Sequence, residues 1–71
     1  MSRYIDMGWI KCRDRLPTND GMYLVTVLTE DSLIVDIATY ETKTDTWTRG
    51  FPMGYSIAWM PLPEPYNEVT E

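Results

Sequence analysis

The chain has 71 residues, with 11 acidic side chains against 6 basic ones and a formal net charge of −5. This length gives one small domain. The acidic balance argues against binding to nucleic acid or to an anionic membrane, because both need Lys and Arg to neutralise phosphate. The sequence has no His and one cysteine, Cys12, which excludes an internal disulfide and leaves a structural zinc site without ligands. We therefore expect no metal or cofactor, and stabilisation by packing within one chain or in a homo-oligomer.

The N-terminal part begins with an arm, residues 1–8, that shows neither clean periodicity nor strong breakers. Its Tyr4 and Ile5 are candidates to cover one face of a sheet. The first alternating run, residues 9–12, predicts a short strand. Pro17 then disfavours helix at the residue before it, and the turn-forming cluster 18–21 leads into the next element.

The centre of the chain holds two β-rich runs, residues 22–28 and 33–40, joined by a polar turn. Side chains alternate between the two faces of a strand, and in both runs the two sets are mostly apolar. A hairpin at the rim of a sheet would carry one polar face. We therefore expect these strands inside the sheet, with each face covered by the rest of the chain or by another molecule.

After the hairpin, residues 42–45 read as a polar turn and residues 46–49 as a returning strand. This return places Trp47 across from Tyr40, where an aromatic pair adds about 0.5–1.5 kcal/mol beyond its buried area.

Glycine and proline dominate the rest of the chain. The cluster 50–54 predicts a turn and residues 55–60 a last strand. Prolines alternate over residues 61–65, and because proline cannot donate to a sheet ladder, this tail is expected to strap the sheet edge.

Together these signals predict an all-β domain over residues 9–66. We expect an antiparallel meander of four to five strands, curled or partly closed, with at most a short helical turn and a proline-rich C-terminal strap. Residues 67–71 are expected to fray.

Segments at both ends of the domain, and single residues between them, carry a family resemblance: Trp9-Ile10, Asp14-Arg15-Leu16-Pro17, Ala38, Tyr40, Trp47 and Trp59-Met60-Pro61-Leu62-Pro63-Glu64-Pro65. The chain resembles a small family of unknown function from tailed bacteriophages and prophages, which runs approximately W-I-x-V-x-D-R-L-P at the start and H-W-M-P-L-P-E-P-P at the end. Ala58 stands where the family usually has His, and Tyr66 where it usually has Pro. The resemblance implies a phage accessory protein, of a kind that often modulates host proteins, defence systems included.

The residues offer no set for catalysis. Without His, the commonest general base and its pairings with Ser or Cys are missing. The cations Lys11 and Arg13 would lower the pKa of the Cys12 thiol, but neighbours in a strand point to opposite faces, so we interpret Cys12 as a small core residue. The four glycines make no phosphate-binding loop. We therefore expect that the protein is not an enzyme.

The expected role is therefore binding of a host or phage protein. We place the protein in the cytoplasm of the bacterial host, because the sequence shows no signal peptide and no apolar run of membrane-spanning length. The scattered acidic residues are typical of solvated surface rather than of a DNA mimic.

Two candidate sites follow from the residue types. Aromatic residues, Met and Arg are enriched at protein interfaces, and the apolar loop around residues 50–54 offers Arg49, Phe51, Met53 and Tyr55. The alternative is a cationic and aromatic pocket for a small anionic ligand such as a nucleotide, built from Arg13, Arg15 and Trp47. Against it, Arg15 fits a structural role in the turn 14–17, with its stem packed over a Trp.

Overall fold

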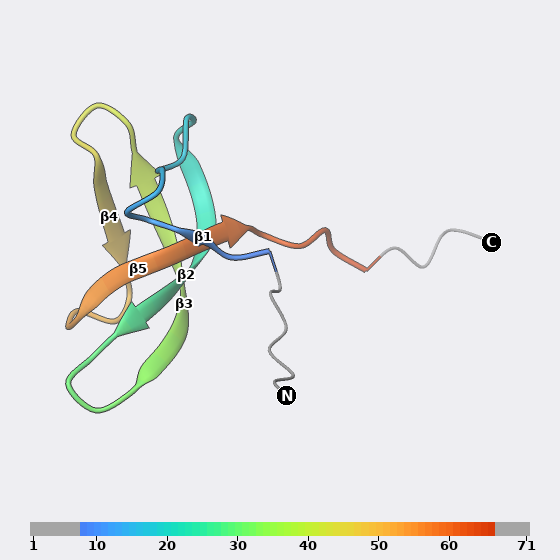
Figure 1. Ribbon diagram of the computed structural model, residues 1–71. Helices are drawn as coiled ribbons and strands as arrows, with labels where there is room; N and C mark the ends of the chain where they lie inside the picture. The colour runs from blue at the N-terminus through green and yellow to red at the C-terminus, as the bar shows by residue number, and fades with distance from the viewer. Residues whose placement is uncertain (1–7, 67–71) are drawn as a thin grey trace.

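Five strands organise residues 8–66, the part of the chain that the computed structural model describes (Figure 1). None of these residues is helical, and every strand pair is antiparallel. The predicted all-β, antiparallel fold is therefore confirmed. The sheet is open and does not close into a barrel; its order is β1-β5-β2-β3-β4. The strands are β1 (Ile10–Lys11), β2 (Gly21–Leu28), β3 (Leu33–Glu41), β4 (Thr46–Arg49) and β5 (Tyr55–Pro61).

The predicted meander covers β2, β3 and β4, which pair in chain order. β5 departs from it by crossing to the far side of β2, where it pairs from Tyr23 to Leu28 and receives β1 on its outer edge. Figure 1 shows β5 lying between β1 and β2. This crossing gives β2 a partner on both sides, so its backbone groups are not left at a sheet edge.

One face of the sheet carries the core. Val25, Val27, Ala38 and Tyr40 are buried on it, together with Trp59, which is 7% exposed. The predicted aromatic pair is confirmed, because Tyr40 lies opposite Trp47 in the register with ring centroids 4.7 Å apart. The core therefore forms from alternate residues of the central strands.

Tyr40 also anchors the β3–β4 turn. Its hydroxyl donates a hydrogen bond to Asp45 at 2.8 Å. Burial, followed by this hydrogen bond and the charge of Asp45, raises the pKa of Tyr40 to about 12. The phenol consequently stays neutral and donating at ordinary pH.

The opposite face of β2 and β3 is apolar and uncovered by residues 8–66. Val35 at its centre is 60% exposed. The sequence predicted that another segment or molecule covers this face. All but the last residue of the arm proposed for it, residues 1–8, lies outside the described residues, as does the tail expected to fray, residues 67–71. We call this surface the open face; its large exposed side chains are Met22, Leu28, Leu33, Val35 and Ile37.

The signature segments at the two ends of the domain meet. The indole nitrogen of Trp59 donates to the carbonyl of Arg15 at 2.9 Å, and Pro17 is buried. The amides of Asp14 and Arg15 both donate to the carbonyl of Lys11, which closes the turn. The segment 14–17 thus holds the strand end that carries Trp59.

The proline-rich tail differs from the predicted strap. Pro61 ends β5 opposite Tyr23, and residues 62–66 are exposed and run away from the sheet in Figure 1. The prolines offer no N–H with which these residues could join an edge.

Candidate functional site

Two turns at one end of the sheet enclose a hollow of about 780 Å³. The β2–β3 turn forms one wall and the β4–β5 loop the other. This hollow is lined by three of the four residues that the sequence predicted to contact a partner: Phe51, Met53 and Tyr55. The fold therefore brings these three side chains together. We call it the loop hollow, lined by Leu28, Thr29, Glu30, Asp31, Ser32, Ile34, Phe51, Met53, Gly54 and Tyr55.

Arg49, the fourth predicted contact, acts inside the loop instead of lining the hollow. Its guanidinium donates to the carbonyls of Phe51 at 2.8 Å, Met53 at 3.0 Å and Gly54 at 2.9 Å. A guanidinium has five N–H donors in a fixed fork, and three carbonyls here fold around it. Arg49 therefore sets the loop's shape.

A carboxylate completes this wall. Asp36 accepts a hydrogen bond from the amide of Phe51 at 3.0 Å and another from the amide of Ile37 at 2.8 Å. The bond from Phe51, then the bond from Ile37, and to a lesser degree the charge of Arg49, lower the pKa of Asp36. The loop is thus tied to β3 as well as to β4.

The opposite wall is also held by internal hydrogen bonds. The Thr29 hydroxyl accepts from the amides of Asp31 at 3.2 Å and Ser32 at 2.9 Å, and the Thr29 amide donates to the Ser32 carbonyl at 2.9 Å. A side-chain oxygen that caps its own turn in this way fixes the turn's conformation. Both walls of the loop hollow are therefore formed without a ligand.

The lining combines exposed apolar side chains with acidic ones. Met53 is 63% and Tyr55 75% exposed, while Glu30 and Asp31 carry the negative charge of the lining. None of the lining residues is basic. The loop hollow can accept an apolar group with a positive charge beside it.

We predict that Arg49→Met loosens the β4–β5 loop and destabilises the fold by about 1–2 kcal/mol, because three carbonyls lose a charged donor in an environment partly screened by water. In this variant, we expect NMR relaxation to show raised backbone mobility at residues 50–54. We also expect a lower midpoint for unfolding in urea. The control Lys43→Met replaces an exposed cation on the β3–β4 turn and should change neither. Equal loop mobility in the Arg49 and Lys43 variants would contradict the clamp role.

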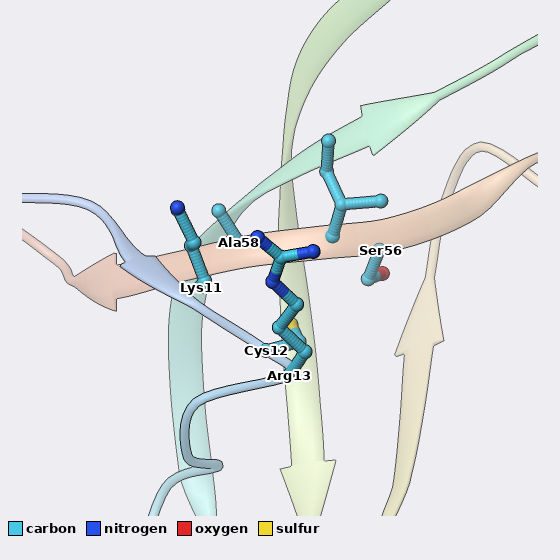
Figure 2. A pocket seen from close by; sticks show the side chains of 6 residues that line it. Lys11, Cys12, Arg13, Ser56 and Ala58 are labelled. Carbon is cyan, nitrogen blue, oxygen red and sulfur yellow. The ribbon is translucent and has the colours of Figure 1, made fainter.

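A second hollow, of about 470 Å³, lies where β1 ends beside β5. In Figure 2 the charged ends of Lys11 and Arg13 lie on either side of Ala58. We call it the edge notch, lined by Lys11, Cys12, Arg13, Ser56, Ile57 and Ala58.

The residues predicted to bind a small anion are not gathered here. Arg13 lines the edge notch, but Arg15 and Trp47 do not. Trp47 packs in the aromatic cluster of the core face, 6.0 Å from Tyr23 between ring centroids. Lys11 and Ser56 were missed by sequence reasoning; the spacing of Lys11 and Arg13, two residues apart, was the signal that could have paired these cations.

Cys12 is a packed residue of the notch wall. It contacts the core cluster, and its amide donates to the Ile57 carbonyl at 2.9 Å. Burial raises the pKa of its thiol, which is opposite to the shift that activates a nucleophile.

Ser56 has a buried hydroxyl without a hydrogen-bond partner among the described residues. An unsatisfied buried polar group costs about 1–3 kcal/mol. Serine at this position therefore lowers stability relative to an apolar residue of similar size.

Acid should weaken the fold through Asp20 as well as Asp36. Asp20 accepts from the Thr42 amide at 2.8 Å and the Thr42 hydroxyl at 2.7 Å, which lowers its pKa. Because the pKa of this carboxyl is lower in the folded state than in the unfolded chain, the ionised carboxylate stabilises the fold at pH values above the ordinary carboxyl pKa of about 3.9. This stabilisation is lost as the pH falls through the folded-state pKa.

The expected result is a melting temperature that drops below about pH 4, with a shallower drop in Asp20→Asn and in Thr42→Val. An acid limb unchanged by both substitutions would contradict this origin.

The described residues define a small open-sheet β protein with two surface hollows and an uncovered apolar face. Residues 8–67 match the family model described as "Protein of unknown function (DUF551)", and the chain belongs to this family. No curated protein and no solved structure matches the chain. Within residues 8–66 there is no apolar helix of membrane-crossing length and no group of three or more side chains suited to hold a metal ion.

Proposed function

We propose that this protein is a non-enzymatic phage or prophage accessory protein that binds and modulates a host or phage protein in the bacterial cytoplasm, as an inhibitor of host defence does. The loop hollow is the binding site. The observation that carries the proposal is an apolar hollow whose two walls are both fixed by internal hydrogen bonds.

Fixed walls favour binding because association otherwise costs free energy to order loops and side chains. In the loop hollow, Arg49 and Asp36 hold one wall and Thr29 the other. The exposed side chains Met53 and Tyr55 are of the types enriched at interfaces. Exposed apolar side chains that cluster in one hollow, rather than lying singly on the surface, are typical of interaction sites.

The charge of the lining indicates the partner. Glu30 and Asp31 lie beside the apolar side chains, and the lining has no cation. Electrostatic complementarity sets specificity and association rate. We therefore expect the partner to insert an aromatic or large aliphatic side chain with a Lys or Arg next to it.

The open face extends the contact area beyond the hollow. Leu28 belongs to both surfaces and pairs in the sheet with Leu33 on one side and Tyr55 on the other. Stable interfaces bury roughly 800 Å² on each partner, which is more than a hollow of this size supplies alone. A partner seated in the hollow can add contact area by also covering the open face, and a second copy of the chain is the competing occupant of the open face.

The phage assignment depends on the family resemblance carried by the signature segments at the two ends of the domain. The Trp59 indole contacts the segment 14–17, so the two motifs that carry the resemblance form one structural unit. The family itself has no function attached to it, and the proposed role therefore depends on the surface.

The test is an affinity capture from bacterial lysate with the tagged chain, its Met53→Asp variant and a matched Tyr66→Asp variant. Tyr66 is 87% exposed on the tail, so it receives the same change away from the hollow. A protein retained by wild type and Tyr66→Asp but lost by Met53→Asp is the expected result. Retention by all three variants would refute the loop hollow as the site.

Native mass spectrometry of the unbound bait distinguishes the competing occupant. One alternative result is that the chain is a dimer, that Val35→Asp dissociates the dimer, and that the capture of no lysate protein is lost in Met53→Asp. This result would replace partner binding by self-association through the open face.

A further inference from the structure

We infer that the edge notch is a second binding site, for a small anion that carries a phosphate or carboxylate group on an aliphatic body. This inference uses none of the residues of the loop hollow and stands apart from the proposed function.

The first observation is local charge. The chain as a whole is acidic, yet the six residues that line the edge notch include two cations, Lys11 and Arg13, and no acid. Neither cation forms an ion pair with a carboxylate among residues 8–66. Figure 2 shows their charged ends flanking Ala58 on β5. Two neighbouring cations that form no ion pair within the described residues are suited to contact the oxygens of a phosphate or carboxylate.

The second observation is the unsatisfied hydroxyl. Ser56 lines the same hollow, and its buried Oγ has no hydrogen-bond partner in the described part of the chain. Buried polar groups are almost always paired, and an exception points to a role. An anion bound in the edge notch would supply the partner that this hydroxyl lacks.

The third observation indicates the chemical nature of the uncharged part of the ligand. Apart from Ser56, the neutral lining beside the cations is Cys12, Ile57 and Ala58, and it contains no aromatic ring. A nucleotide base is held by stacking on aromatic side chains, and Trp47, which could stack, packs against Tyr40 on the core face instead. An aliphatic body therefore fits the notch better than a base.

The experiment is an amide-resolved NMR titration of the full chain with four probes: hexyl phosphate, hexanoate, inorganic phosphate and adenosine monophosphate. We expect hexyl phosphate, hexanoate or both to give saturable shifts at residues 11–13 and 56–58, with tighter binding than inorganic phosphate. The comparison of hexyl phosphate with hexanoate identifies the preferred anionic group. Tightest binding by adenosine monophosphate would overturn the aliphatic assignment.

Variants separate a built site from general attraction to cations. Arg13→Gln should weaken the tightest probe about tenfold, the loss of one charge-assisted contact, and Lys11→Gln should act similarly. Ser56→Ala should weaken binding while raising the melting temperature, a combination that unfolding cannot produce. Lys43→Gln, on the β3–β4 turn, should leave binding unchanged. No saturable shift with any probe, or equal binding by the Arg13 and Lys43 variants, would overturn the inference.

Discussion

Gly54→Ala is expected to lower the free energy of unfolding by about 2–4 kcal/mol, a large loss for so small a domain. The backbone of Gly54 has a φ of +80°, a conformation that residues other than glycine rarely adopt. A Cβ at this position would clash with the carbonyl oxygen of Leu28 and lie 3.0 Å from a methyl carbon of Val27. Because the nearest atom belongs to the backbone at the end of the central strand β2, the loop itself must move.

A urea titration measures the effect, and Gly50→Ala in the same loop is the matched control. A Cβ at Gly50 meets no atom within 4 Å, and its φ lies outside the left-handed region. Its variant should stay within about 0.5 kcal/mol of wild type. Similar losses in both variants would show that the loop tolerates no side chain for some reason other than this close approach.

Trp59→Ala should cost about 3–5 kcal/mol, the range for removing a large buried aromatic side chain. Trp59 pairs in the sheet with both Ile10 and Val25. Its ring packs edge-on against Tyr23 with centroids 5.2 Å apart, and its indole donates to the Arg15 carbonyl. The substitution removes the side chain that packs against the core and the hydrogen bond that ties the segment 14–17 to β5.

Trp59→Phe separates the two contributions, because it keeps a ring and removes the N–H donor. We expect it to cost about 1–3 kcal/mol from the unpaired carbonyl and the smaller ring. Tyr55→Ala in the same strand, at a side chain mostly in solvent, should be close to neutral in the same urea titration. If Trp59→Ala were as mild as Tyr55→Ala, the account of the core would be wrong.

Local sequence pattern was sufficient to predict the strands and the central hairpin. Period-two alternation and turn residues placed β2, β3, β4 and β5 within one residue at each end. The Tyr40–Trp47 pair followed from the turn between them. These features depend on contacts between neighbouring segments, which a sequence records directly.

The crossing of β5 and the makeup of the sites were not predictable in this way. Pairing of β5 with β2 joins segments about thirty residues apart, and no local signal distinguishes it from pairing with β4. Arg49 illustrates the same limit, since an arginine beside an apolar loop suggested a contact surface. Its role depends on three carbonyls that face it only after the loop folds.

The most direct test of the loop hollow is photo-crosslinking from position 53. A photoreactive phenylalanine analogue replaces Met53 in one variant and Tyr66 in another, and both are irradiated in bacterial lysate before mass spectrometry. We predict a crosslink from position 53 to one protein, at an aromatic or large aliphatic residue next to a Lys or Arg, and no such crosslink from position 66. The same products from both positions, or a crosslinked segment without a basic residue, would contradict the binding site proposed here.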